Sequence, residues 1–231
     1  MRTIGWLSRL DEAAIAELER SATSKRYGRG ELIFAPTPQP QSVYLLQSGL
    51  ARIYRLSESG GETTFGYVAP GAVFGELPAL GDYARESFAQ AVRPSQVWKI
   101  PRETFQKVLF ERAELALQVS RQIGDRLKRI ECRIEDLVFR NVRTRVARIL
   151  GELAADFGQP VNGHRVIDIP ITQSELATLV GATRQTVNQT LRELSEDGLI
   201  GRENRRIVLL RPEQLEQMVL RAERAERAER A

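Results

Sequence analysis

The stretch from Thr172 to Ile200, TQSELATLVGATRQTVNQTLRELSEDGLI, is the most informative part of this sequence. Thr172 and Glu175 fit a capping box, in which each side chain accepts from the other residue's backbone N–H at the start of a helix. Gly181 ends that helix where a positive φ is expected, and Thr183 caps a second helix. The apolar residues of the two helices fall on inward faces: Leu176, Ala177, Leu179, Val180, Val187, Leu191 and Leu194. This pattern predicts a helix-turn-helix, with an ordinary helical hairpin as the alternative.

The second helix of this motif carries long polar side chains on its outer face. In a helix-turn-helix the second helix enters the DNA major groove, where Arg pairs with guanine and Gln or Asn pairs with adenine. We therefore predict double-stranded DNA as a partner. The predicted contacts in the two helices are Thr172, Gln173, Ser174, Thr183, Arg184, Gln185, Thr186, Asn188, Gln189 and Arg192.

The segments around the motif complete a winged helix. GRENRRIVLL, residues 201–210, reads as strand, polar turn and strand. Its side chains Arg202, Arg205 and Arg206 are predicted to contact phosphates, which set affinity and register, although a solvated basic hairpin is the alternative. Upstream, Asn141 can cap a helix over Val142–Phe157, Asn162-Gly163 signals a turn, and Val166–Ile171 is predicted to be a strand. Residues 141–220 are thus the predicted DNA-binding domain, with a hinge at 139–141.

The N-terminal half has a different pattern of apolar and polar residues. Residues 1–24 are predicted to form one or two short helices, and residues 27–101 alternate apolar and polar positions between turns at Gly49, Gly60-Gly61 and Pro70-Gly71. Short strands with such turns favour a β-barrel or jelly roll, assigned to residues 1–108. The chain is therefore predicted to be an α+β protein.

Residues 102–138 are predicted to be helical, with a dimerisation helix over 109–140. Apolar side chains repeat there at spacings of 3 and 4, which is typical of a dimer seam. The seam residues are Ile123, Leu127, Ile130, Ile134 and Leu137. The alternative is a helix packed on its own barrel. A homodimer suits DNA binding, because paired helix-turn-helix units contact half-sites one helical turn apart.

Composition limits the remaining classes. The 231 residues include 34 basic and 30 acidic side chains, and the net charge of +4 suits nucleic acid without proving it. A lone Cys132 permits no disulfide within the chain and is read as a passive residue, while His164, the only histidine, is expected on a surface turn. Without an apolar run of signal or membrane length, a cytoplasmic protein with no membrane partner is expected. We find no P-loop, paired metal-ligand motif or nucleophile with a histidine base, so neither an enzyme nor a metal site is predicted. The tail RAERAERAERA, residues 221–231, is read as a solvated helical extension with Glu223–Arg227 and Glu226–Arg230 pairs.

A β-roll, a long dimer helix and a winged helix together resemble the cyclic-AMP receptor protein and FNR (CRP/FNR) family of bacterial transcription regulators. The resemblance runs from about Leu7 to Leu210, and FGELPAL at 74–80, the Gly49 and Gly71 turns and the helix-turn-helix carry it. It implies a cyclic-nucleotide-binding-like β-roll (a double-stranded β-helix), a dimerisation helix and a C-terminal winged helix. It also implies a homodimer that binds palindromic promoter sites and recruits RNA polymerase, through the loop that corresponds to residues 158–165.

In this family, the segment corresponding to residues 75–91 binds the effector phosphate. A turn after Gly75 offers N–H groups to an anion, Glu76 could accept from a ribose hydroxyl, and Arg85 could pair with phosphate. The candidate effector residues are Gly75, Glu76, Leu77, Arg85, Glu86, Ser87, Arg126, Ile130 and Glu131. Two departures from cyclic-AMP binders are Glu86, where a small hydroxyl residue is usual, and Ile130-Glu131 in place of the pair that recognises adenine.

The identity of the effector therefore stays open. Arg126 and Glu131 match positions that some nitrogen-control members use for 2-oxoglutarate. Cyclic AMP, no small effector and, less favoured, 2-oxoglutarate are the alternatives, and Glu76 with Arg85 could instead be a structural salt link. An iron–sulfur cluster needs more cysteines than Cys132, and haem is not expected because His164 lies in the wrong domain.

The operator is also predicted to differ from that of the best-known relatives, which place an Arg-Glu…Arg set at the start of the recognition helix. Arg184 is kept, but Gln185 and Gln189 replace the other two. The resemblance leaves open the target genes and whether the protein activates or represses.

Overall fold

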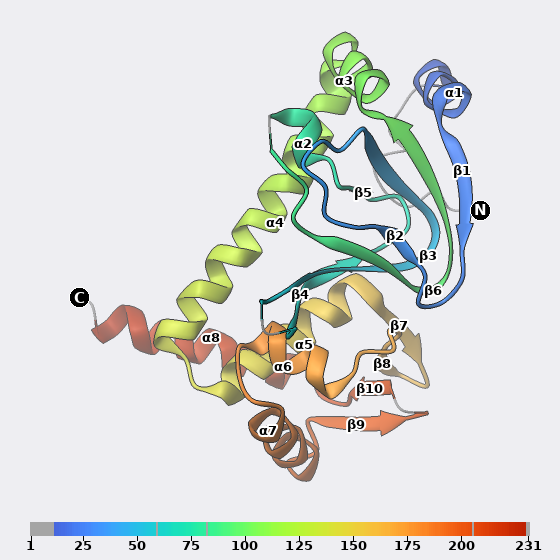
Figure 1. The fold of residues 1–231 in the computed structure, drawn as a ribbon. Coiled ribbons are helices and arrows are strands. Elements are labelled where there is room, and N and C mark those ends of the chain that lie inside the picture. Colours follow the sequence, from blue (N-terminus) through green and yellow to red (C-terminus); the bar gives the residue numbers. More distant parts are fainter. Residues whose placement is uncertain (1–11, 59, 82, 205, 230–231) are drawn as a thin grey trace. The chain divides into compact units, whose positions relative to one another are not determined.

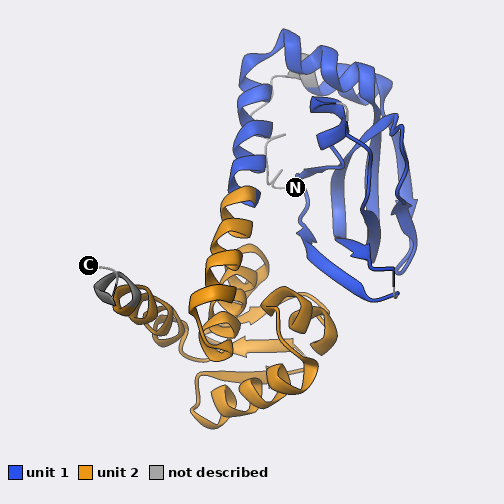
Figure 2. Ribbon diagram, turned by 60° about the vertical axis from the view of Figure 1, so that its left-hand side comes forward, with its two compact units in different colours: residues 1–126 blue, residues 127–231 orange. Residues whose placement is uncertain are grey.

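The computed structural model describes residues 12–58, 60–81, 83–204 and 206–229, and its chain forms two compact units, Met1–Arg126 and Leu127–Ala231 (Figure 2). Both units combine helices with antiparallel sheets, which confirms the predicted α+β class. The four predicted domains, 1–108, 109–140, 141–220 and 221–231, divide the chain by function rather than by compactness. They stay a prediction.

The first unit is a β-roll with helices gathered toward one end (Figure 1). One antiparallel sheet has the strand order β1-β6-β3-β4, with β2 paired to β6 and β5 paired to β3. The strands are β1 (Thr23–Tyr27), β2 (Leu32–Phe34), β3 (Ser42–Leu56), β4 (Glu62–Val68), β5 (Val73–Phe74) and β6 (Phe88–Pro101). The helices are α1 (Glu12–Ser21), α2 (Leu77–Leu80), α3 (Arg102–Glu111) and the first half of α4 (Ala113–Phe139).

Strand β3 separates two apolar cores. Val43 and Leu45 pack with Phe105 and Leu115 beneath the helices, whereas the intervening Tyr44 packs inside the roll among the aromatic rings of β2 and β5. Side chains alternate between the two faces of a strand, so one apolar strand can supply both cores. This explains why β3 is buried on both faces rather than showing a simple alternation with polar residues.

Three details of this unit differ from the sequence-based expectation. Gly49 is not a turn: it lies within β3 at φ 96°, where a Cβ would stand 2.3 Å from Ser95 Oγ. The predicted helix over 102–138 breaks at Arg112, so that α3 and α4 are separate. Strands β3 and β6 have 15 and 14 residues, longer than the short strands predicted, because their mutual pairing continues past several bulges. The turns at Gly60 and Gly71 are confirmed.

The second unit holds the C-terminal half of α4 and a four-stranded sheet of order β7-β8-β10-β9. Its other elements are α5 (Val142–Phe157), β7 (Gly158–Val161), β8 (His164–Ile167), α6 (Gln173–Val180), α7 (Arg184–Glu196), β9 (Ile200–Glu203), β10 (Arg206–Leu209) and α8 (Pro212–Glu229). Asn141 caps α5 as predicted, because its side chain accepts from the backbone N–H of Thr144 at 2.9 Å. The wing strands β9 and β10 are also confirmed.

One strand of this unit differs in its bounds from the prediction. The strand predicted over 166–171 is β8, which begins at His164 and ends at Ile167. Asn162 and Gly163, both at positive φ, form a two-residue turn that pairs β8 with β7 directly, so the turn fixes where the strand begins. At its end Asp168 donates its backbone N–H to the Phe157 carbonyl, and the chain leaves the sheet. None of the helices within the described residues is long and apolar enough to span a membrane.

Candidate DNA-binding surface and effector cavity

The helix-turn-helix is closed by the caps that its sequence predicts. Thr172 Oγ1 accepts from the Glu175 backbone N–H at 3.1 Å, and Glu175 Oε2 accepts from the Thr172 backbone N–H at 2.7 Å. Gly181 has φ 68°, and Thr183 Oγ1 accepts from the Thr186 backbone N–H at 3.1 Å. The tight turn that joins α6 to α7 is therefore held by backbone geometry and by local hydrogen bonds.

The turn also packs against α4. A Cβ on Gly181 would lie 2.4 Å from Leu137 Cδ2, so a larger residue here would displace the Leu137 side chain. Leu137 thus contacts its own helix-turn-helix, although 51% of the residue remains exposed. The last turn of α4 thus contacts the turn between α6 and α7, while α5 packs against both helices.

Helix α7 presents a polar outer face over an inner face that is apolar except for Thr190, whose hydroxyl donates to the Thr186 carbonyl. Val187 and Leu194 have no exposed surface and Leu191 is 5% exposed. The exposed predicted contacts are Thr172, Ser174, Thr183, Arg184, Gln185, Thr186, Gln189 and Arg192, whereas Gln173 and Asn188 are half-buried. The hydroxyls of Thr183 and Thr186 are hydrogen-bonded to each other, so these two side chains already have a role in the cap.

The wing arginines differ from one another. Arg202 and Arg206 are both exposed, but Arg206 Nη1 lies 3.0 Å from Asp168 Oδ1. Arg206 would have to share its charge between Asp168 and a phosphate, which makes Arg202 the stronger candidate for a phosphate contact. Arg205 lies outside the described residues.

In the first unit, a cavity of about 150 Å³ lies beside α2. Seven of the predicted effector residues line it: Gly75, Glu76, Leu77, Arg85, Glu86, Ser87 and Arg126. Ile130 and Glu131, the other two, belong to the second unit and do not line this cavity. Phe34, Phe74 and Arg55 also line it, and nothing in the sequence marked them as effector residues.

Arg85 forms part of the cavity wall and is only 6% exposed. Its Nη2 donates to the carbonyls of Ser42 at 2.6 Å and Gly75 at 2.9 Å, and its guanidinium carbon lies 4.3 Å from the centroid of the Phe34 ring. Burial lowers the pKa of Arg85, but an arginine so held remains charged. Arg85 Nε is buried and has no partner among the described residues.

Glu76 is paired with Arg126 rather than with Arg85, which corrects the predicted Glu76–Arg85 link. Arg126 Nη1 lies 2.7 Å from Glu76 Oε1, and Arg126 Nη2 donates to the Val73 carbonyl at 2.7 Å. Glu76 is 2% exposed, so a carboxylate buried here requires such a partner. The Glu86 side chain is 63% exposed and pairs with Arg55 instead of opposing an anion.

An apolar stripe on α4 stays exposed in the isolated chain. Leu127, Ile130, Ile134 and Leu137 are each about half exposed, at 54%, 47%, 58% and 51%. Ile123, the fifth predicted seam residue, packs in part against the core of its own β-roll. Packing on its own barrel therefore applies to Ile123, and the dimer seam stays a prediction for the other four residues.

The C-terminal half of α4 is joined to α5 and α8 by buried charges. Asp136, which is 4% exposed, has one carboxylate oxygen 2.7 Å from Arg140 Nε and the other 2.8 Å from Arg148 Nε. Glu223 completes the cluster at 2.6 Å from Arg148 Nη2. Burial raises the pKa of the Asp136 carboxyl, while Arg148 and Arg140 oppose that shift.

This cluster corrects the prediction that residues 221–231 form a purely solvated tail. The Glu223 side chain is only 29% exposed and lies within α8, which is packed on α5. No local signal could have found this contact, because Glu223 looks like every other glutamate of the repeat. The side chains of residues 226–231 lie outside the described part, and so do the predicted Glu223–Arg227 and Glu226–Arg230 pairs.

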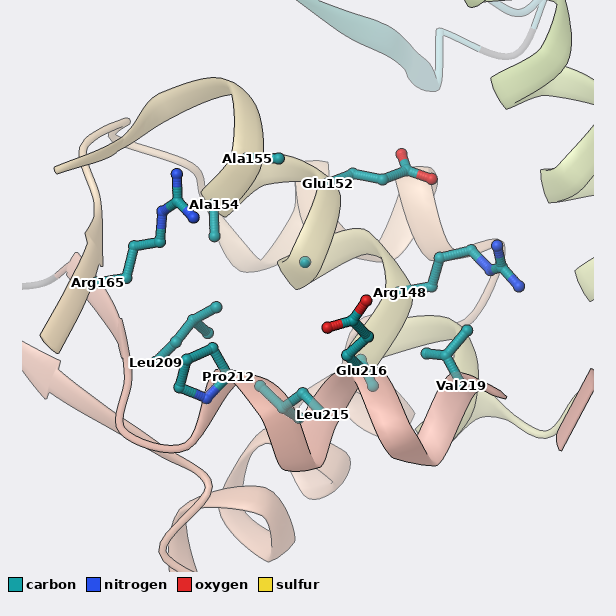
Figure 3. Close-up of a pocket in the computed structure, with 12 residues that line it drawn as sticks. Arg148, Glu152, Ala154, Ala155, Arg165, Leu209, Pro212, Leu215, Glu216 and Val219 are labelled. Atoms are coloured by element: carbon teal, nitrogen blue, oxygen red, sulfur yellow. The ribbon is translucent and has the colours of Figure 1, made fainter. Parts of the chain in front are cut away.

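A second cavity, of about 390 Å³, lies between α5 and α8 (Figure 3). Leu209, Pro212, Leu215 and Val219 form one side, and Ala154 and Ala155 belong to the other. Arg165 stands at one end and Arg148 at the opposite end, with the Glu216 carboxylate between them (Figure 3). Ligand pockets of this size are common, but the mixed charges at this rim select no class of occupant.

Comparison with known proteins now decides the family. Residues 24–112 match the family model of the cyclic nucleotide-binding domain, and residues 144–218 match that of the Crp-like helix-turn-helix domain. The Global nitrogen regulator of Synechococcus elongatus is 34% identical over 195 residues, which cover 84% of this chain and 88% of that protein. The chain belongs to the CRP/FNR family of transcription regulators.

Two further relatives agree with this assignment. The CRP-like cAMP-activated global transcriptional regulator of Mycobacterium tuberculosis is 30% identical over 206 residues, covering 89% of this chain and 92% of that protein. A solved structure of a CRP/FNR transcriptional regulator from Thermus thermophilus has a TM-score of 0.69 at 27% identity, covering 85% of this chain and 98% of the other. This CRP/FNR protein is thus a DNA-binding transcription regulator, not an enzyme.

Proposed function

We propose that this CRP/FNR regulator binds palindromic promoter DNA as a homodimer, with α7 of each protomer in the major groove, and that it does so without a small-molecule effector. The observation that carries the DNA-reading part is the exposed face of α7, where Arg184, Gln185 and Gln189 stand clear of the apolar core. Such side chains at the start of a recognition helix have the hydrogen-bonding groups that distinguish base pairs.

The exposed stripe of α4 supports the homodimer. Half-exposed leucine and isoleucine side chains at heptad spacing favour burial against a second copy, since the hydrophobic effect scales with the apolar area removed from water. Two copies joined along α4 would present two α7 helices, as binding to a palindrome requires.

Effector-independent binding is supported by the state of the cavity in the β-roll. Its volume of about 150 Å³ is below the roughly 300–1,000 Å³ typical of ligand pockets. Glu76 already has Arg126 as its partner, and Arg85 already donates to two backbone carbonyls. A ligand that used the Glu76 carboxylate or Arg85 Nη2 would have to displace these internal contacts before it could bind.

Cyclic AMP is the second candidate. The buried Arg85 Nε without a described partner, together with the positive φ of Gly75 beside it, favours an anion at this point. A relative described as cAMP-activated supports the same alternative. For 2-oxoglutarate, Arg126 would have to release Glu76, so we favour this ligand least.

We also propose a cytoplasmic location and contact with RNA polymerase through residues 158–165, as the family resemblance implies. In the structure this segment is the hairpin of β7 and β8, with exposed residues at its tip.

Selection of binding sites from random double-stranded DNA, without any additive, tests the DNA-reading proposal. Arg184→Ala should then weaken binding by about 1–3 kcal/mol and relax the preference at one symmetric base pair. Arg202→Ala should weaken selected and random DNA alike and lower the salt slope by about one for each phosphate that is no longer neutralised. If Arg184→Ala reduced affinity for both kinds of DNA equally, Arg184 would be a phosphate contact instead.

Arg85→Ala separates the two effector alternatives. If Arg85 is structural, the variant should lower the stability of the free protein by about 1–3 kcal/mol, because the Ser42 and Gly75 carbonyls lose their donor. Cyclic AMP should then leave the melting temperature of the wild type unchanged. The exposed Arg55→Ala variant is the control, with an expected change within about 0.5 kcal/mol. A rise in wild-type melting temperature with cyclic AMP that disappears in Arg85→Ala would refute effector independence.

A further inference from the structure

The side-chain amide of Gln189 is hydrogen-bonded to a neighbouring carboxylate on the outer face of α7. Gln189 Nε2 donates to Glu193 Oε1 at 3.1 Å. The two residues are four positions apart and therefore adjacent on the helix surface. Gln189 is exposed, and 42% of the Glu193 side chain is exposed, so the pair stands on the surface that includes the predicted base contacts.

Glu193 is itself held from outside the recognition helix. Its second oxygen, Oε2, lies 3.7 Å from Nη1 of Arg143, which comes from the first turn of α5. Arg143 also pairs with Asp197, the residue that caps the end of α7. The carboxylate is thus fixed between a partner on its own helix and a cation on another, which restricts the directions in which it can present its oxygens.

This arrangement determines which end of the Gln189 amide faces the carboxylate. An amide has two N–H donors and one carbonyl acceptor, whereas an ionised carboxylate only accepts. Glu193 must therefore receive an N–H of Gln189 and cannot face its carbonyl oxygen. When Glu193 takes the N–H that points away from the carbonyl oxygen, the other N–H and that oxygen lie side by side and remain available.

A donor beside an acceptor matches adenine in the major groove. Adenine presents the N7 acceptor next to the N6 amino donor, whereas guanine presents two acceptors, N7 and O6. An amide that can turn over exchanges the positions of its donor and its acceptor, so it could fit the edges of other bases more easily than an amide held in one orientation. The fixed amide of Gln189 therefore matches adenine, and its carbonyl oxygen would face O6 of guanine unfavourably.

We propose that Glu193 is a positioning residue for base recognition: by holding the amide of Gln189, it makes Gln189 selective for adenine over guanine. This inference rests on the proposed DNA reading by α7. It assigns to Glu193 a role in specificity without direct contact with a base, and to Arg143 the role of supporting Glu193.

The test measures base preference at one operator position. The site selected by the wild-type protein defines the operator, and Gln189→Ala identifies the symmetric position where the preference for adenine is lost. Competition binding then compares operators with adenine and guanine at that position. The wild type should prefer adenine by roughly 5–150-fold, the discrimination of a good bidentate pair, and Glu193→Ala should reduce this ratio by about two- to tenfold.

Two variants show whether the effect is specific. Glu193→Gln keeps an oxygen that can accept from Gln189 but adds N–H groups that can face the Gln189 carbonyl oxygen, so its adenine preference should fall between those of the wild type and Glu193→Ala. Glu196→Ala removes the same charge from an exposed position on the same helix. It should strengthen binding to both operators alike through weaker repulsion of phosphate and leave their ratio unchanged.

A double variant completes the test. Adding Glu193→Ala to Gln189→Ala should not change the adenine-to-guanine ratio further, because Glu193 acts through Gln189. The inference is overturned if Glu193→Ala leaves the wild-type ratio intact, or if it changes the ratio equally when Gln189 is absent. A wild-type protein that selects no sequence at all would instead refute the proposed DNA reading.

Discussion

Replacing Asp136 by alanine should lower the free energy of unfolding of the second unit by about 3–5 kcal/mol, the usual effect of removing one partner from a buried ion pair. Asp136 lies between the guanidinium groups of Arg140 and Arg148 at 2.7 and 2.8 Å. Its removal leaves two close cations that share the carboxylate of Glu223. The junction of α4, α5 and α8 should therefore loosen.

The chain offers an internal control for this measurement. Trp98 is buried in a core of the first unit, and the other tryptophan of the chain, Trp6, lies outside the described residues. In urea, at one fixed protein concentration, the helical circular dichroism of the second unit should be lost earlier, while the tryptophan fluorescence transition should stay in place. Glu135→Ala, which removes an exposed acid next to Asp136, should change neither transition appreciably. Equal effects of the two variants would show that the cluster does not hold this junction.

Ile130→Glu should convert the protein from dimer to monomer. In a dimer along α4 this side chain, 47% exposed in the single chain, would be buried against the partner, and an unpaired carboxylate there should cost roughly 3–5 kcal/mol. Sedimentation velocity should show the smaller species. Affinity for a palindromic site should fall by about 100-fold or more, because one protomer loses the second, linked binding event.

The matched control for this variant lies on the same helix. Lys128→Glu introduces the same acid at an exposed position outside the heptad seam and should remain dimeric. The circular dichroism of both variants should stay close to that of the wild type, since neither side chain belongs to the described apolar cores. A dimeric Ile130→Glu variant would contradict the seam.

The DNA-binding motif was predictable from the sequence because its signals are local. The caps at Thr172 and Thr183 and the turn at Gly181 each involve residues within four positions of one another. Asn162-Gly163 likewise specifies its hairpin through backbone conformation alone. Periodicity on α4 identified an apolar stripe in the same way, since residues three and four apart share a helix face.

The periodicity of apolar residues places side chains on one face of a helix but does not identify their contacts. The pattern on α4 includes Ile123 with the seam, but part of that side chain packs on the β-roll. Similarly, Gly49 resembles a turn residue in the sequence, whereas the structure uses its missing side chain for the approach of Ser95. A pattern states which residues share a face or favour a conformation, but it does not state what packs against them.

The order of the domains, the helix-turn-helix with its caps, and the apolar stripe could all be predicted without a structure, because each depends on neighbours along the chain. The charge partners could be identified only in the folded chain: Arg126 with Glu76, Arg148 with Asp136 and Glu223, and Arg143 with Glu193. These partners are 50 or more positions apart in three of the four pairs. With 34 basic and 30 acidic side chains, local sequence cannot single out such pairs, and packing of the helices selects them.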